Sequence, residues 1–352
     1  MRLKGEMGTA LAVAAAIVGA GFASGREIVT FFSCTGWASW IGRVLACALI
    51  GALAAMLAEF ARRTGARSFP GIYARAMNRA CGDSVQVLHG VTMLLTASVM
   101  LTAGGELGAL TLPLHGAYPV SMAFTLLAAL LLTRRRLGAL GCMGFLLVPA
   151  VCVYYFLLAV DSNPAPVRAL NDAGSMEMPG NVAAAGFLGV LYAALNAAMS
   201  GGVVASRMRP EIRPKRLGAL VAVLLLVMLI PANAALLRAG EGVRRLALPG
   251  VVLAARWGSA GFYASALIMW MSVVSTLAAA LGSIEAQARE ACLNPRTAVC
   301  LAALMSACLS VVGFQGLVQV GYPLLGWACA LILLALVPFL PGSEADLQES
   351  ED

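Results

Sequence analysis

Charged residues are scarce in this sequence. Asp, Glu, Lys and Arg make up 12% of the 352 residues, about half of the roughly 25% found in soluble domains. Hydrophobic residues account for 61%, the mean hydropathy is +0.87, and no stretch is long and polar enough for a separate soluble domain. These scarcities exclude an ordinary soluble protein and indicate a polytopic all-α membrane protein.

Residues that carry metal or hydrolytic chemistry are also few. The two histidines, His89 and His115, lie far apart, and the nine cysteines form no CxxC pair and mostly lie within apolar runs. We therefore expect no metal site, no disulfide framework, no cofactor and no enzymatic activity. The net charge of +7 does not indicate nucleic acid as a partner, because the basic residues lie at the ends of the apolar segments. The expected surroundings are a lipid bilayer and a small solute.

Long apolar segments dominate what is present, and each is close to the roughly 20 residues that a membrane-spanning helix needs. Because further spans follow, we interpret the first segment as an uncleaved helix rather than a signal peptide. The ten predicted spans are 8–33, 37–61, 85–110, 117–133, 138–160, 182–206, 216–238, 259–285, 297–314 and 319–340.

The basic residues predict the orientation of these spans. With the N-terminus inside, 17 Lys and Arg residues fall in the inner segments and 5 in the outer ones. Cytoplasmic loops carry an excess of Lys and Arg, so both termini are expected in the cytoplasm. On the outer side we expect a polar loop at Asp161–Asn181 and an amphipathic helix at Arg244–Gly258.

The chain divides into two halves of five spans, at 8–160 and 182–340, followed by an acidic tail at 342–352. Five is an odd number, so the second half must enter the membrane from the opposite side. The sequence therefore predicts a single membrane domain built as a 5+5 inverted repeat. It leaves the oligomeric state open.

Glycines interrupt two spans that correspond in the two halves. The first span contains Gly19, Gly21 and Gly25 followed by Arg26 and Glu27, and the sixth contains the stretch 195–202, LNAAMSGG. Glycine weakens a helix by about 1 kcal/mol relative to alanine, and small residues can alternatively mark close helix packing. Interruptions at matching positions of two halves point to a transporter binding site, so we expect helices 1 and 6 to be broken.

The run at 19–28, GAGFASGREI, resembles the signature of YkvI-like bacterial membrane proteins, and Tyr322-Pro323-Leu324-Leu325-Gly326 resembles the ending of that family. These proteins are similar to the amino acid–polyamine–organocation superfamily. The resemblance implies the leucine-transporter fold and a transporter in the cytoplasmic membrane.

The same resemblance implies a substrate site at the first interruption. Backbone N–H groups of Gly19, Ala20 and Gly21 would meet a substrate carboxylate, which agrees with the partial positive charge at the N-terminus of a half-helix. In the sixth span, Tyr192 and Asn196 are candidate substrate contacts. Phe22 is a candidate lid, or else a packing residue.

A sodium site is implied by the sodium-coupled members of the superfamily. The sodium ligands would be the carbonyl oxygens of Ala15 and Val18 together with oxygens of the eighth span. Ser and Thr in membrane helices alternatively bond to carbonyls of their own helix. The candidate ligands of the eighth span, spaced i, i+3 and i+4, are Ser272, Ser275 and Thr276.

Charged groups inside membranes usually face a cavity and pair with one another. Arg26 and Glu106 are candidates for an outer gate, although both could instead simply reach the outer interface. Glu27 is a second candidate partner of Arg26. Glu59 and Glu285, at inner span ends beside basic loops, are expected to form solvated ion pairs.

Taken together, the sequence predicts a secondary transporter that moves a small polar, amino-acid-like solute by alternating access. Sodium coupling is favoured, and proton coupling with Glu106 as carrier is the alternative. A nutrient receptor of the germination type on the same fold is the alternative. A channel fits poorly with two broken helices at one midplane site.

Overall fold

The computed structural model describes residues 2–134, 137–161 and 180–339, without the side chains of residues 2–4, 20, 134 and 137–145. Most of the predicted polar loop at Asp161–Asn181 and the predicted acidic tail at 342–352 lie outside the described residues. Every regular element in the described ranges is helical. These elements are α1 (Arg2–Ile17), α2 (Ala20–Ala23), α3 (Arg26–Phe31), η1 (Ser33–Ala38), α4 (Ser39–Thr64), α5 (Phe69–Ala76), α6 (Arg79–Thr111), α7 (Ala117–Arg134), α8 (Leu137–Val160), α10 (Val182–Arg207), α11 (Pro214–Arg238), α12 (Glu241–Arg244), α13 (Pro249–Ala254), η2 (Ala255–Trp257), α14 (Gly258–Glu290), α15 (Pro295–Leu309), η3 (Ser310–Val312), α16 (Phe314–Gly316), the π-helical turn η4 (Leu317–Gly321), α17 (Tyr322–Ala335) and η5 (Val337–Phe339).

Seven helical stretches of the described chain are long and apolar enough to cross a membrane. Three shorter apolar helices, at Gly5–Ile17, Ala117–Thr133 and Leu146–Val160, coincide with the first, fourth and fifth predicted spans. The protein is therefore an all-helical, multi-pass membrane protein. The count of ten spans and the 5+5 repeat stay predictions.

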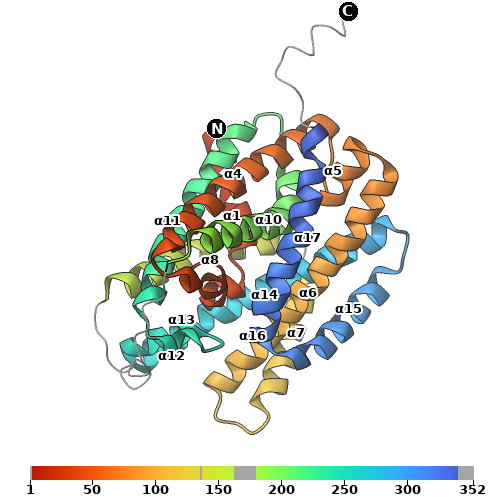
Figure 1. Cartoon of the computed structure of the whole chain (residues 1–352). Helices are drawn as coiled ribbons and strands as arrows, with labels where there is room; N and C mark the ends of the chain where they lie inside the picture. Colours follow the sequence, from red (N-terminus) through yellow and green to blue (C-terminus); the bar gives the residue numbers. More distant parts are fainter. Residues whose placement is uncertain (1, 135–136, 162–179, 340–352) are drawn as a thin grey trace, which may run out of the picture.

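The long helices form two packed groups (Figure 1). In one group α4 packs against α10 and α11, and α1 packs against the same two helices; in the other, α6 and α14 pack against each other and against α7 and α15. Glycines set the close approach inside the first group. A Cβ at Gly42 would lie 2.6 Å from the Ala185 carbonyl oxygen, and one at Gly51 would lie 2.6 Å from the Gly218 carbonyl oxygen. Small residues at such crossings give membrane helices their van der Waals contact.

The predicted break in the first span is confirmed. Regular helix stops at Ile17, resumes for one turn at Ala20, and starts again at Arg26 after Gly25, whose φ is 81°. At the first stop the Gly19 N–H donates to the Ile17 carbonyl (2.8 Å) rather than to the carbonyl four residues back. Gly25 takes a left-handed conformation that residues with a Cβ rarely adopt, so it sets the second change of direction.

The predicted break in the sixth span is wrong, because α10 runs without interruption from Val182 to Arg207. Its polar side chains bond within the helix: Asn196 Nδ2 donates to the Tyr192 carbonyl (2.9 Å), and Ser200 Oγ donates to the Asn196 carbonyl (2.7 Å). Opening the helix would leave backbone groups unsatisfied in an apolar setting, which is costly. Gly201 serves packing instead, since a Cβ there would collide with the Phe69 ring.

The expected amphipathic helix at Arg244–Gly258 is not one continuous helix: α12 ends at Arg244, a turn follows, and α13 and η2 run from Pro249 to Trp257. Pro249 begins α13, as proline favours the first helical position and cannot continue a preceding helix. In Figure 1 α12 and α13 lie at the end of the molecule opposite α5.

Candidate transport site

The backbone around the break is held by groups from two other elements. The Tyr155 hydroxyl, on α8, donates to the carbonyls of Phe22 (2.9 Å) and Ala23 (3.1 Å). The Gly250 N–H, on α13, donates to the Ser24 carbonyl (2.7 Å). Carbonyls released from a helix inside a membrane need partners of this kind. The fold therefore supplies hydrogen-bond donors that stabilise the irregular backbone.

The first interruption faces α14 at one of the predicted sodium ligands. A Cβ at Gly19 would lie 3.3 Å from Thr276 Oγ1, so the Thr276 hydroxyl lies beside the point where α1 ends. Ser275 is half-buried like Thr276, whereas Ser272 is fully buried and its hydroxyl donates to the Ile268 carbonyl of its own helix (3.1 Å). The structure thus places Thr276 against the break, while the Ser272 side chain follows the alternative, intrahelical pattern.

Two carbonyls at the end of α1 are free of helix bonding. The Gly19 N–H, which a continuous helix would direct to the Ala15 carbonyl, donates to Ile17 instead (2.8 Å). Within the described chain the Phe22 N–H, which a continuous helix would direct to the Val18 carbonyl, makes no such bond. Carbonyl and hydroxyl oxygens are the ligands that hard cations prefer. Free carbonyls on α1 and a hydroxyl on α14 are the kinds of ligand that such an ion needs.

The second glycine of the break meets a carboxylate. A Cβ at Gly21 would collide with the side chain of Glu27, which folds back from the first turn of α3. Glu27 is only 6% exposed, and its Oε2 is buried with no hydrogen-bond partner. Sequence reasoning considered this residue only as a partner for Arg26. Its position just after a glycine-rich break inside an apolar span was the signal that it belongs to the site.

Tyrosines on three helices interact electrostatically with this carboxylate. Tyr155 on α8, Tyr192 on α10 and Tyr322 on α17 are all buried and all lie within electrostatic range of Glu27. The Tyr192 ring packs edge-on against Phe31 (centroids 5.3 Å apart) and Phe32 (4.9 Å), and its hydroxyl has no partner.

The other candidate substrate contacts lie in the same core. Phe22 is fully buried and meets Tyr155 edge-on with ring centroids 6.0 Å apart. Asn196 lies one turn beyond Tyr192 on α10 and is 3% exposed. Ala20 belongs to α2, but its side chain is outside the described residues.

Arg26 is bound to the outer helices. Its Nη1 donates to the carbonyls of Arg244 (2.8 Å) and Leu246 (3.2 Å) at the end of α12. Glu106, half-buried on α6, makes no ion pair with it among the described side chains. The structure therefore brings Arg26 to the α12–α13 segment and does not bring it to Glu106.

A cavity of about 430 Å³ opens beside Arg26. Three arginines and one carboxylate make it predominantly basic, and Glu241 in its wall pairs with Arg245. Its wall consists of Arg26, Val29, Ser33, Cys34, Glu241, Arg244, Arg245, Gln315 and Gln319.

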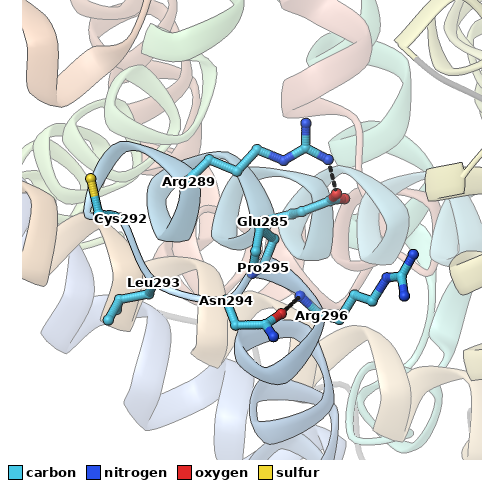
Figure 2. Close-up of a pocket in the computed structure, with 7 residues that line it drawn as sticks. All are labelled: Glu285, Arg289, Cys292, Leu293, Asn294, Pro295 and Arg296. Atoms are coloured by element: carbon cyan, nitrogen blue, oxygen red, sulfur yellow. Dashed lines mark hydrogen bonds and ion pairs between the residues drawn. The ribbon is translucent and has the colours of Figure 1, made fainter.

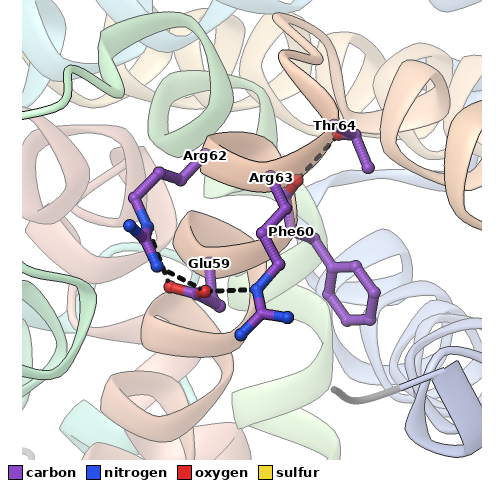
Figure 3. A network of polar contacts seen from close by, with 5 residues as sticks. All are labelled: Glu59, Phe60, Arg62, Arg63 and Thr64. Carbon is purple, nitrogen blue, oxygen red and sulfur yellow. Dashed lines mark hydrogen bonds and ion pairs between the residues drawn. The ribbon is translucent and has the colours of Figure 1, made fainter. Parts of the chain in front are cut away.

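Two ion-paired clusters lie away from the break. Glu59 binds Arg62 (2.7 Å) and Arg63 (2.5 Å) at the end of α4, as Figure 3 shows, and Glu285 binds Arg289 near the end of α14. The predicted ion pairs of Glu59 and Glu285 are thereby confirmed. The second pair borders a surface cavity of about 490 Å³ at the turn from α14 to α15 (Figure 2).

That surface cavity has a structural explanation. Asn294 Oδ1 accepts from the Arg296 N–H (3.0 Å) and so caps the start of α15. Exposed pairs one helical turn apart contribute about 0.3–0.5 kcal/mol each. The cavity of Figure 2 therefore lies at a capped helix–helix turn and contains none of the predicted site residues.

Comparison with known proteins identifies one curated relative. The chain is 30% identical over 147 residues to the uncharacterized membrane protein YkvI of Bacillus subtilis (strain 168), and the match spans 42% of each protein. The chain is similar to YkvI. The resemblance inferred from the motif at 19–28 is thereby confirmed, although the match covers less than half of the relative. No protein-family model matches the chain.

Solved structures identify the fold. Mhp1, a nucleobase-cation-symport-1 family transporter in a closed conformation with bromovinylhydantoin bound, matches with a TM-score of 0.60 at 15% identity, over 96% of this chain and 76% of Mhp1. A manganese transporter of Eremococcus coleocola matches with a TM-score of 0.59 at 12% identity, over 95% and 77%. A Na⁺-coupled sialic acid symporter in a substrate-bound outward-open state matches with a TM-score of 0.59 at 12% identity, over 94% and 78%.

These neighbours are secondary transporters and not enzymes. Identities of 12–15% establish a shared fold and no more. The chain therefore has a transporter fold, and its solute and coupling ion have to be argued from its own residues.

Proposed function

We propose that this protein is a secondary active transporter of a small polar, amino-acid-like solute, coupled to sodium and working by alternating access. It belongs in the bacterial cytoplasmic membrane with ten spans in a 5+5 inverted repeat and both termini in the cytoplasm. The observation that carries the proposal is the break at Gly19, where regular helical bonding of α1 ends and the Thr276 hydroxyl of α14 lies against the glycine.

The sodium ion is assigned to the first interruption. Its ligands would be the Ala15 and Val18 carbonyls together with oxygens of the eighth predicted span. Sodium is a hard cation and needs no formal charge from the protein when neutral oxygens surround it. The oxygens contributed by α14 would be the Ser272 carbonyl and the Ser275 and Thr276 hydroxyls.

The solute is assigned to the other side of the break. Backbone N–H groups of Gly19, Ala20 and Gly21 would receive its carboxylate, with Phe22, Tyr192 and Asn196 around it. Broken spans hold substrates in this way because their freed backbone groups line a cavity. Arg26 would gate the outer entrance through its hold on the α12–α13 segment, with Glu106 farther out on α6.

Uptake into proteoliposomes tests the proposal. Purified protein is reconstituted, and accumulation of each of the radiolabelled proteinogenic amino acids is measured with an inward sodium gradient, an inward proton gradient or neither. We expect accumulation of at least one amino acid only with the sodium gradient. Accumulation with the proton gradient alone would transfer the coupling role to a carboxylate such as Glu106.

A receptor of the germination type is the second candidate, because the similarity to the uncharacterized protein YkvI does not distinguish a transporter from a receptor. It predicts saturable amino acid binding to the purified protein with no accumulation under any gradient. That outcome would reject the transport proposal and keep the fold.

A further inference from the structure

Glu27 is the most unusual charged group of the described chain. It lies within the first predicted span, is 6% exposed, and forms no hydrogen bond or ion pair with any other described residue; its Oε2 is buried without a partner. Burying an ionised carboxylate without a partner is strongly unfavourable. Such a group requires either a proton or a cation from outside the protein.

Within the part of the chain that the structure describes, no basic side chain supplies that cation. The neighbouring Arg26 directs its guanidinium to the Arg244 and Leu246 carbonyls. The candidate sodium site lies at the end of α1, where Thr276 is beside Gly19, whereas the Glu27 side chain lies against Gly21. The carboxylate is therefore left for a ligand that enters the site.

The surroundings of Glu27 favour an organic ammonium group over a bare metal ion. Three buried tyrosines lie within its electrostatic range, and Tyr192 adds a buried hydroxyl with no partner. Aromatic faces attract organic cations, most strongly in desolvated sites. A buried carboxylate with aromatic side chains in its electrostatic neighbourhood suits an organic ammonium group.

The cavity beside Arg26, the residue next to Glu27 in the chain, adds a second constraint on the ligand. The cavity beside Arg26 is basic, with Arg244 and Arg245 in its wall against a single carboxylate, Glu241. A wall of this sign favours a ligand with an anionic group and opposes a simple cationic amine. A basic cavity at Arg26 and a buried carboxylate at the next residue fit a molecule that carries both charges.

We propose that Glu27 is the counter-ion for the ammonium group of a zwitterionic solute. The inference rests on the proposed function and narrows its substrate class to solutes with a free amine and a carboxylate. The ammonium group lies against the Glu27 carboxylate and the Tyr192 hydroxyl, and the solute carboxylate faces the backbone N–H groups of the break.

The test compares matched probes on purified protein and in proteoliposomes. Each proteinogenic amino acid is paired with its N-acetyl derivative, which lacks the ammonium group, and with its decarboxylated amine. Binding is followed by the shift in melting temperature, and transport by accumulation. We expect the wild type to bind and accumulate at least one zwitterion, and to bind its N-acetyl derivative at least tenfold more weakly.

Variants then assign the effect to the carboxylate. Glu27→Gln should weaken binding of that zwitterion at least tenfold, as expected for loss of a buried charge-assisted hydrogen bond, and Glu27→Asp should retain part of the affinity. Glu285→Gln, which removes an exposed carboxylate at the end of α14, should behave as the wild type. Size-exclusion profiles of all variants establish that they are folded.

The outcomes separate this inference from the proposed function. Wild-type accumulation that is equal for the N-acetyl derivative, or unchanged in Glu27→Gln, overturns the inference alone. Glu27→Gln protein that binds normally but loses proton-driven accumulation makes Glu27 a proton carrier and also overturns it. A wild type that accumulates no probe counts against the proposed function as well.

Discussion

At the scale of single residues, two glycines of the break have different neighbours and therefore different roles. Gly19 faces a hydroxyl on another helix, and Gly21 faces a carboxylate from the next turn of its own span. In both cases the missing side chain makes room for a polar group of the protein. The glycines thus do more than weaken the helix.

Gly21→Ala is expected to lower solute affinity at least tenfold, because the added methyl group would displace the Glu27 side chain. Affinity is measured by thermal shift and by uptake. The matched control is Gly202→Ala on α10, where a Cβ meets no atom within 4 Å and alanine favours the helix. Normal binding by the Gly21 variant would move the solute site away from the break.

The sodium proposal has its own residue test. Ser275→Ala and Thr276→Val should raise the sodium concentration for half-maximal uptake by about tenfold to a hundredfold, since stripping a partner from a buried polar site costs about 1–3 kcal/mol. Solute affinity at saturating sodium should stay nearly unchanged. Ser265→Ala, whose hydroxyl bonds the Phe262 carbonyl of the same helix (2.8 Å), is the control. Unaltered sodium dependence in both variants would refute the site.

At the scale of elements, the α12–α13 segment is tied to the break at two points. The Arg26 guanidinium binds carbonyls at the end of α12, and the Gly250 N–H of α13 binds the Ser24 carbonyl. A movement of this segment would therefore disturb the backbone beside the site. This coupling is the physical basis for treating Arg26 as a gate.

Arg26→Gln should loosen this segment while leaving the rest of the bundle intact. Two hydrogen bonds from a charged group are lost, each contributing about 1.5–3 kcal/mol, so amide protection over residues 241–254 should fall at least tenfold in hydrogen exchange. Arg245→Gln removes only an exposed pair with Glu241 and should change protection less than twofold. Equal effects of the two variants would argue against the gate.

At the scale of the whole molecule, side-chain hydrogen bonds join helices that are distant in sequence. Glu6 accepts from the Arg213 N–H (3.1 Å), so the start of α1 lies beside the start of α11. The Tyr73 hydroxyl donates to the Ile332 carbonyl (3.0 Å), which joins α5 to the last turn of α17. The α12–α13 segment lies at the other end of the molecule (Figure 1).

Orientation is testable with single cysteines in a background without the native ones. His115→Cys, in the exposed turn between α6 and α7, should react with an impermeant maleimide in intact cells. Pro210→Cys, in the exposed turn between α10 and α11, should react only after permeabilisation, because its flanking basic residues favour the cytoplasm. The opposite labelling pattern would invert the orientation and reject the placement of both termini.

The sequence by itself determined the features that depend on local composition. Hydropathy located the apolar segments, and the glycines at 19–25 located the break in the first span. The position of Glu59 and Glu285 at inner span ends beside basic loops predicted their ion pairs. These properties are decided within one or two helical turns, where propensity and hydropathy act directly. Contacts between helices that are distant in sequence are not decided within one or two turns.

Only the tertiary structure decided which groups meet. It kept α10 helical because its polar side chains find bonds within the helix, sent Arg26 to α12 rather than toward Glu106, and placed Thr276 beside Gly19. It also buried Glu27 among tyrosines of three helices. A carboxylate's neighbours depend on how helices far apart in sequence pack, and that packing is a property of the whole chain.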